Sequence, residues 1–195
     1  MSTSEPPRGS ATSEWATSEW DEFGFAPDHD EPVPYRKRIR DYYVTLGFGT
    51  PYRWAHYADV PFVAVTKPVA KMRVALVTTA APYKEGAGDQ GPGASYNNAA
   101  KFYNLYSGDS SKDHDLRISH IGIDRKHTTA EDINTWFPLP ALRDAAKRGL
   151  IGEVAPRFHG LPTNRSHKTT LDVDCQDLLS RVQEDRADAA IIAAN

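Results

Sequence analysis

Val74-Ala-Leu-Val-Thr-Thr79 is a continuous apolar and β-branched run that leads into a proline-containing loop. Runs of this kind are typical of strands that are buried on both faces of a sheet. Three later runs have a similar character and span residues 116–123, 151–155 and 189–193. We expect residues 74–79 to form the first central strand and the three later runs to join it.

Helical patterns accompany these strands. Residues 139–148 form an amphipathic pattern, with Pro140 in the first turn and Gly149 as the C-terminal stop. A second amphipathic pattern covers residues 173–187, and a third helix is expected near 95–106. Strands that alternate with helices predict an α/β fold with a parallel sheet and right-handed crossovers. We expect this sheet to be incomplete at its C-terminus, where the last predicted strand is followed by no further element.

The chain contains one cysteine, Cys175, so it cannot form an internal disulfide or a cysteine-based zinc site. Cys175 shares the apolar face of the second amphipathic helix with Leu178 and Val182, and Asp172 or Asp174 can cap that helix. A thiol buried on such a face is hidden from substrate. We therefore interpret Cys175 as a packing residue and not as a nucleophile.

The chain has 195 residues, a net charge of −3 and a low mean hydropathy, which fits one sizeable soluble domain with an appendage. Its apolar stretches are shorter than the roughly 20 residues that a membrane helix needs, and its first residues lack the features of a signal peptide. We expect a cytoplasmic protein with no membrane association.

Residues 1–34 contain eight acidic residues and a single basic one, Arg8. They also contain a tandem pentapeptide, Ala11-Thr-Ser-Glu-Trp15 followed by Ala16-Thr-Ser-Glu-Trp20. This composition is typical of a disordered acidic tail, although the two tryptophans can also anchor a partner.

Basic and aromatic side chains are interleaved between Tyr35 and Tyr57. Such a mixture can bind single-stranded nucleic acid, with cations for phosphates and rings for bases. The cluster is short, and we favour a helix over residues 36–46 that packs on the main domain, with no nucleic-acid partner. The predicted parts are a tail over 1–34, an aromatic and basic lead-in over 35–72, and an α/β domain over 73–195.

Gly86-Ala-Gly-Asp-Gln-Gly91 matches the dinucleotide-binding pattern G-x-G-x-x-G. In that motif the first glycine ends a strand and the last one opens a helix. Here residues 82–85 intervene and Pro92 follows. We expect a flexible loop over the strand ends, able to close over a substrate, and no cofactor bound by this chain.

Histidines and acidic residues concentrate in the thirteen residues from His120 to Asp132. Such a set can bind a divalent metal or supply a general base. Because it lacks H-E-x-x-H or two histidines one helical turn apart, we expect no metal site. His120 interrupts an apolar strand, and two interpretations stay open: a buried imidazole bonded to its neighbours, or a site residue near the strand's C-terminal end.

Several motifs together resemble one enzyme family. They are Met72-Arg-Val-Ala-Leu-Val-Thr-Thr-Ala80, Ser119-His120, Glu131-Asp-Ile-Asn-Thr-Trp-Phe-Pro138, Ile151-Gly-Glu-Val-Ala155 and Phe158-His159, in that order. Their order and spacing resemble those in the selenoprotein component, selenoprotein B, of D-proline, glycine, sarcosine and betaine reductases, with the D-proline branch nearest. The resemblance covers about residues 60–195.

This resemblance implies an oxidoreductase that reductively cleaves a carbon–nitrogen bond in a small amino acid or amine. Enzymes of this kind act on X–H and Y–H bonds with a disulfide as acceptor, and dithiols carry the electrons. In the family, a pyruvoyl group on a partner subunit activates the amine. The implied partners are the substrate, the pyruvoyl-bearing subunit and a thiol reductant, and an uncovered last strand would also favour an oligomer.

The resemblance further implies that His120, Asp132, Asn134 and His159 position substrate or transfer protons, without assigning individual roles. Asp132 and Asn134 have an alternative role, since either one can cap the helix that begins near Pro138.

The nucleophile of the family is selenocysteine, or cysteine in some relatives, and the matching position would come just after Asn195. A selenolate or thiolate at a strand end is stabilised by the helix N-terminus that follows it. We expect that a UGA codon for selenocysteine was read as a stop, which would leave the 195-residue product inactive. The alternative is a short non-catalytic paralogue that binds a partner protein or a small molecule.

Overall fold

The computed structural model describes residues 34–47, 57–61, 63–92, 94, 97–118, 131–163 and 166–194. The chain divides into two units, Met1–Trp54 and Ala55–Asn195, which are described separately. The first unit contains helix α2, Tyr35–Thr45, close to the predicted bounds. No helix in the described ranges is long and apolar enough to cross a membrane.

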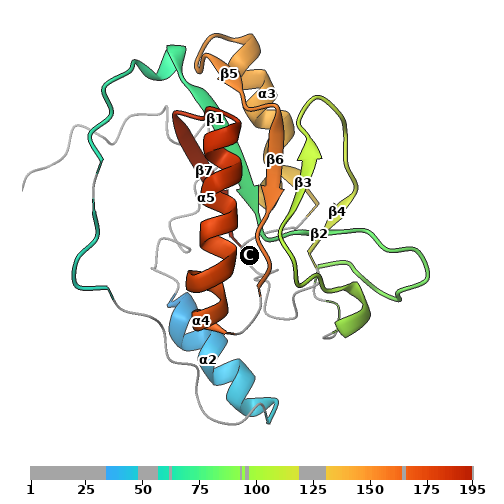
Figure 1. Cartoon of the computed structure of the whole chain (residues 1–195). Helices are drawn as coiled ribbons and strands as arrows, with labels where there is room; N and C mark the ends of the chain where they lie inside the picture. The colour runs from blue at the N-terminus through green and yellow to red at the C-terminus, as the bar shows by residue number, and fades with distance from the viewer. Residues whose placement is uncertain are drawn as a thin grey trace, which may run out of the picture. The chain divides into compact units, whose positions relative to one another are not determined.

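The second unit contains an α/β fold built from short elements (Figure 1). Its described elements, in chain order, are η2 (Val69–Lys71), β1 (Arg73–Thr78), β2 (Ala81–Pro82), η3 (Asn98–Ala100), β3 (Tyr106–Asp109), β4 (Leu116–Arg117), η4 (Ile133–Thr135), α3 (Leu139–Lys147), β5 (Glu153–Val154), β6 (Arg157–Gly160), α4 (His167–Thr169), η5 (Thr170–Asp174), α5 (Cys175–Glu184) and β7 (Ala189–Ala193).

Strand β1 is the centre of the main sheet, as its apolar sequence predicts. Strand β7 runs parallel to it along one edge, from the pair Val74↔Ala189 to the pair Thr78↔Ala193. The other edge of β1 pairs in parallel with β5 at its start and with β6 at its end. Pro156 separates β5 from β6, because proline has no N–H to donate to the ladder.

The sheet is mixed and not purely parallel, which corrects the predicted topology. Strand β3 pairs with β6 in antiparallel orientation and lies beside it in Figure 1. The prediction of a helix near residues 95–106 is wrong. The described part of this stretch contains only the 3₁₀ turn η3, and Tyr106 begins β3. The sequence of β3, Tyr106-Ser-Gly-Asp109, lacks β-branched residues and contains glycine and aspartate, so its strand signal is weak.

The strand predicted over residues 116–123 also differs from the structure. Leu116–Arg117 forms β4, which pairs with β2 in a separate two-stranded antiparallel sheet. The predicted strand therefore does not join the main sheet at this point, and residues 119–123 lie outside the described ranges.

The apolar core lies between the sheet and helix α3. Leu139 and Leu142 of α3 pack in one buried cluster with Val74 and Leu76 of β1 and with Phe158 of β6. Helix α3 matches the predicted helix over 139–148, and Figure 1 shows it and α5 on opposite faces of the sheet. Alternate side chains of β1 and β6 therefore face two different environments.

Two aromatic rings cover two glycines across the β3–β6 ladder. Tyr106 pairs with Gly160, and Phe158 pairs with Gly108. A Cβ atom on Gly160 would lie 1.8 Å from Cε1 of Tyr106, and one on Gly108 would lie 2.3 Å from Cε1 of Phe158. Both positions thus require glycine, because the rings occupy the space of a side chain.

The C-terminal helix is longer at its start than the predicted 173–187. It runs through α4, η5 and α5 without interruption, and η5 is a π-helical turn. Its cap is Ser166, whose hydroxyl oxygen accepts a hydrogen bond from the Thr169 N–H, and not Asp172 or Asp174 as predicted. Cys175 is half-buried, less enclosed than the predicted packing role implies.

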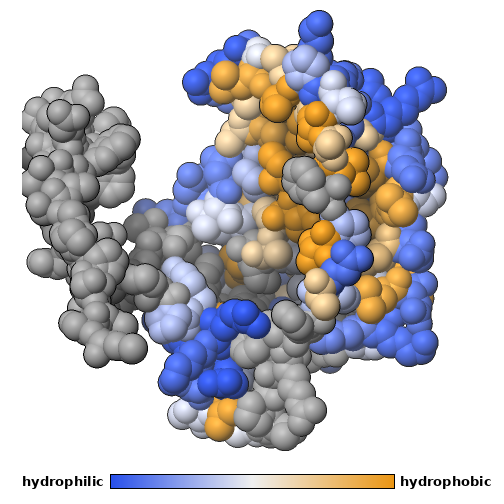
Figure 2. Space-filling model, turned by 90° about the vertical axis from the view of Figure 1, so that its left-hand side faces the viewer, coloured by the Kyte–Doolittle hydropathy of each residue, from blue (hydrophilic) through white to orange (hydrophobic). Residues whose placement is uncertain are grey.

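Strand β7 has the predicted bounds but not the predicted burial. Ile191 is 45% exposed and Ile192 is 62% exposed. Neighbouring residues of a strand point to opposite faces, so both faces of β7 are open here. Apolar side chains gather on the side of the molecule shown in Figure 2. The large apolar residues that are exposed in β7 and in the helix before it are Leu171, Val173, Leu179, Ile191 and Ile192.

The Gly160→Ala substitution should destabilise the protein, because the new methyl group would overlap the Tyr106 ring. We expect the free energy of unfolding, measured by urea denaturation, to fall by about 1–3 kcal/mol. Gly91→Ala is the matched control, since its Cβ would meet only the Asp89 carboxylate, at 3.3 Å. A Gly160→Ala variant as stable as the control would contradict the described packing.

Candidate functional site

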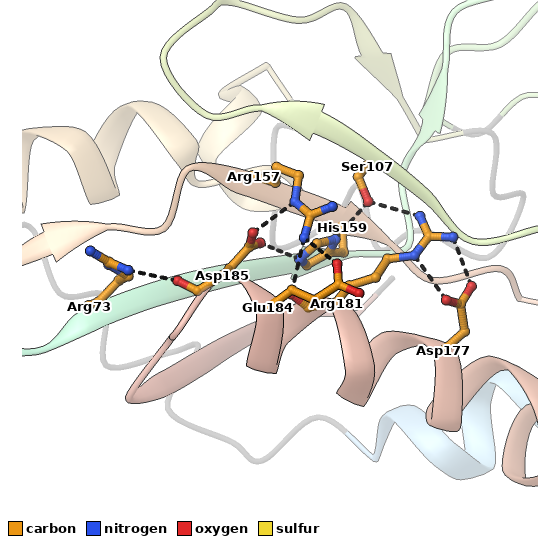
Figure 3. A network of polar contacts seen from close by, with 8 residues as sticks. All are labelled: Arg73, Ser107, Arg157, His159, Asp177, Arg181, Glu184 and Asp185. Carbon is orange, nitrogen blue, oxygen red and sulfur yellow. Dashed lines mark hydrogen bonds and ion pairs between the residues drawn. The ribbon is translucent and has the colours of Figure 1, made fainter.

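A polar network occupies the face of the sheet that α5 covers (Figure 3). Ser107 of β3 and His159 of β6 are cross-strand partners, and Ser107 Oγ lies 2.9 Å from His159 Nδ1. On the other side of the ring, His159 Nε2 lies 3.0 Å from Asp185 Oδ2. A hydroxyl, an imidazole and a carboxylate are thus joined in one hydrogen-bonded chain.

Asp185 connects three elements at the end of α5. Its Oδ1 accepts a hydrogen bond from Arg157 Nε at 2.8 Å, and its backbone carbonyl accepts one from Arg73 Nη1 at 2.9 Å. The residue is only 5% exposed. A buried carboxylate is stable only when it is paired and hydrogen-bonded, and Arg157 and His159 meet this need.

Arg181 lies one turn before Asp185 and binds Ser107, at the other end of the hydrogen-bonded chain. Its Nη1 donates to Ser107 Oγ at 2.9 Å, while Nε and Nη2 donate to the Asp177 carboxylate at 3.0 and 2.8 Å. Asp177 therefore fixes the guanidinium group that holds Ser107.

His159 is fully buried, and its surroundings favour the neutral form of its imidazole. Burial lowers the pKa of its imidazole below the ordinary value. The Asp185 carboxylate acts in the opposite direction, whereas the positive charges of Arg157 and Arg181 lower the pKa of His159 further. Desolvation is the largest of these effects, so the neutral ring is favoured near neutral pH.

The network lies toward the C-terminal ends of the parallel strands. His159 is in register with Val77, the penultimate residue of β1, and Val77 is in register with Ile192 of β7. Open α/β sheets bind their ligands at this end. The geometry therefore places the His159 imidazole close to the edge at which open α/β sheets bind ligands.

Asp132 and Asn134 form a second cluster at the start of α3. Asp132 Oδ1 accepts hydrogen bonds from the backbone N–H and the side-chain amide of Asn134, both at 2.9 Å. Asn134 Oδ1 accepts from the N–H of Ala141, in the first turn of α3, at 3.1 Å. These are capping contacts, so Asp132 and Asn134 do have the structural role at the start of α3 that the sequence left open. A role of these two residues toward substrate stays a prediction.

His120 lies outside the described residues, together with Asp124 and His127 of the same histidine-rich window. Within the ranges that the structure does describe, no three His, Cys, Asp or Glu side chains are arranged to hold a metal ion. Neither interpretation of His120 is tested by the structure.

The glycine-rich loop is crossed by hydrogen bonds. Gly86 and Gly88 have φ values of 72° and 79°, which favour glycine. The buried Gln90 accepts from the Lys84 N–H at 3.0 Å and donates to the Lys84 carbonyl at 2.7 Å. The glycines thus allow the backbone turns of this loop, and hydrogen bonds from the loop's own side chains stabilise it.

Sequence reasoning found His159 but missed its partners Ser107, Asp185, Arg157 and Arg181. One usable signal was the alternation in Arg157-Phe-His-Gly160, which places arginine and histidine on one face and phenylalanine and glycine on the other. A strand prediction based on this alternation would have separated the polar face from the core face.

Stability should fall as the pH is lowered through about 6.5, the ordinary pKa of an unfolded histidine. The pKa of His159 is lowered in the folded protein, so the unfolded chain takes up its proton first and acid favours unfolding. Urea denaturation at about pH 7.5 and about pH 5.5 should show a smaller loss in His159→Gln than in the wild type.

The exposed His167 provides the control, because His167→Gln removes a histidine outside the buried network and leaves His159 in place. An equal loss of stability in His159→Gln and the wild type would show that His159 is not held neutral by burial.

Comparisons with known proteins agree on one family. A family model described as glycine/sarcosine/betaine reductase selenoprotein B (GRDB) matches residues 41–195. The chain is also 30% identical over 132 residues to the D-proline reductase subunit gamma of Acetoanaerobium sticklandii, an alignment that covers 67% of this chain and 51% of the relative. The chain thus spans about half the length of this curated relative. No solved structure matches it.

Proposed function

Because the chain belongs to the glycine/sarcosine/betaine reductase selenoprotein B family, we propose that it is part of an oxidoreductase that cleaves a carbon–nitrogen bond in a small amino acid or amine. The observation that carries this proposal is the family match over residues 41–195, which includes the main sheet and the His159 network. The curated relative, named as a D-proline reductase subunit, makes D-proline the first substrate to test.

The reaction needs protons as well as electrons. Reductive cleavage leaves one new hydrogen on carbon and one on nitrogen, which together take up two electrons and two protons. In the proposed reaction a thiol or selenol pair supplies the electrons and becomes a disulfide or selenenyl sulfide. His159, His120, Asp132 and Asn134 are our candidates for proton transfer and substrate positioning.

The redox nucleophile is proposed to be a selenocysteine or cysteine that follows Asn195, beyond the end of β7. Cys175 does not suit this role, since it lies in the first turn of α5 and is half-buried. Residues just past β7 would lie at the same end of the sheet as the network, because β7 and β6 run parallel on either side of β1 and Val77 is in register with both His159 and Ile192.

The proposed enzyme is cytoplasmic and has several components. The relative is named as a subunit, which supports partner subunits for this chain as well. We propose that one of these partner subunits carries a pyruvoyl group. The exposed apolar residues of α5 and β7, including Leu179, Ile191 and Ile192, would be covered by the further polypeptide of a chain as long as the relative.

The gene sequence after the Asn195 codon tests where the nucleophile lies. We expect a UGA codon, an in-frame cysteine codon three positions later, and further coding sequence for a helix and a strand. A UAA or UAG codon, or no coding sequence beyond it, would contradict this proposal and favour a non-catalytic paralogue.

A reductase assay completes this test. The longer product, combined with its partner subunits and a dithiol, should convert D-proline or a glycine derivative, while the 195-residue product should not. Replacing the selenocysteine or cysteine by serine should abolish turnover and leave the fold unchanged.

A further inference from the structure

Helix α2 has few features that would stabilise it by itself. It has 11 residues, none of them is buried, and the side chain of its N-cap, Pro34, makes no capping hydrogen bond. Its first turn contains Arg36, Lys37 and Arg38 and no acidic residue, so these cations oppose the helix dipole. Isolated helices of this length are marginally stable in water. We therefore expect α2 to depend on contacts with residues outside the helix.

One side of α2 combines apolar side chains with arginines. Four residues recur at helical spacing and share one side, here called the aromatic face. They are Tyr35, Ile39, Tyr42 and Leu46. Between 40% and 46% of Tyr35, Tyr42 and Leu46 is exposed. Arg36 and Arg40 follow one border of this face, and Arg38 lies on the other border.

The charge of α2 is strongly positive. The helix contains four basic residues and a single acidic residue, Asp41. Asp41 is shared by two cations, since its Oδ2 lies 2.5 Å from Lys37 Nζ and its Oδ1 lies 3.6 Å from Arg40 Nε. Guanidinium groups bind carboxylates through charge-assisted hydrogen bonds, and they also bind the faces of aromatic rings. The surface therefore fits a peptide that is both acidic and aromatic.

The chain itself contains such a peptide before α2. Residues 19–25, Glu19-Trp-Asp-Glu-Phe-Gly-Phe25, combine three acidic and three aromatic side chains and are here called the acidic–aromatic segment. They begin at the end of the second copy of the tandem pentapeptide. The first copy ends at Trp15 and is followed by Ala16-Thr-Ser18, which has neither property. Both the segment and α2 belong to the first unit, Met1–Trp54.

The connection between the segment and α2 is long enough for the two to meet. Nine residues separate Phe25 from Tyr35, and three of them are prolines. At about 3.1 Å per residue such a linker spans up to about 28 Å. Helix α2 is about 16 Å long at 1.5 Å per residue. A tether this short also gives a millimolar effective concentration, so individually weak contacts are sufficient.

We propose that the acidic–aromatic segment binds the aromatic face of α2 within the same chain. Its carboxylates pair with the arginines that border this face, and its rings cover Tyr35 and Tyr42. The contact also supplies the negative charge that the first turn of α2 lacks. It is independent of the proposed reductase function, because the segment and most of α2 precede residue 41, where the family match begins.

Carbodiimide coupling of the full 195-residue chain tests the contact, because this reagent joins only carboxylates and amines that touch. We expect peptide mapping to find Lys37 joined to Glu19, Asp21 or Glu22, in addition to its neighbour Asp41. Lys112 is the matched control. Its side chain is similarly exposed and also lies near a local carboxylate, that of Asp109, and it should not couple to residues 19–22.

The tandem repeat provides a matched pair of variants. Trp20→Ala should greatly reduce coupling of Lys37 to residues 19–22, whereas Trp15→Ala, in the identical pentapeptide, should leave it unchanged. Loss of the contact should also make the amide hydrogens of α2 exchange about two- to fivefold faster in Trp20→Ala than in Trp15→Ala. Equal coupling and equal exchange rates in the two variants would overturn the proposal.

A charge swap separates a direct contact from a general effect on the helix. Arg36→Glu with Arg40→Glu should abolish coupling between Lys37 and Asp21, and adding Glu19→Arg with Glu22→Arg should restore it. Failure of the swap to restore coupling would contradict pairing between the two segments. Mixing ¹⁴N- and ¹⁵N-labelled chains identifies the source of the segment. Coupled peptides should carry one label only, and mixed labels would show that a second copy binds α2 and would overturn the intramolecular contact.

Discussion

The buried carboxylate of Asp185 is the constraint on which the polar half of the structure depends. It is 5% exposed, and its two oxygens accept hydrogen bonds from Arg157 and His159 of β6. Its backbone carbonyl accepts a third, from Arg73 of β1. Removing the Arg157 guanidinium would leave the buried carboxylate without its ion-pair partner, which would destabilise the fold. The end of α5 is therefore fixed against two strands of the sheet at once.

Side chains of β6 alternate between the two faces of the sheet, so this short strand contacts both the apolar core and the polar network. Phe158 and Gly160 face α3 and pack against the aromatic and glycine residues of β3. Arg157 and His159 face α5 and hold Asp185. The aromatic–glycine pairs set the register between β3 and β6, and this register places Ser107 opposite His159. Core packing thus positions the Ser107 hydroxyl against the buried imidazole of His159.

The sequence predicted the elements whose signal is local. Apolar runs located β1 and β7, and an amphipathic pattern with a proline start and a glycine stop located α3. Strands β3 and β6 were not predicted because they are short and contain glycines. These glycines are explained only by the rings of Tyr106 and Phe158 that lie against them in the structure. The antiparallel edge of the sheet was missed for this reason.

The site was only partly predictable for a related reason. Family resemblance selected His159, but its partners lie far away in the sequence: Asp185 is 26 residues from it, and Ser107 is 52 residues from it. Contacts of this range leave no pattern in a single sequence. The expected burial of β7 was also wrong, because that inference assumed neighbours on both faces that the described residues do not supply.

A double-mutant cycle between Asp185 and His159 tests most directly whether the network acts as one unit. Asp185→Ala, His159→Ala and the double variant would be compared with the wild type by urea denaturation at neutral pH. The structure predicts a coupling free energy of about 1–3 kcal/mol, so that the double variant is less destabilised than the sum of the single variants. Additive effects of the two substitutions would contradict the network that links α5, the sheet and the proposed site.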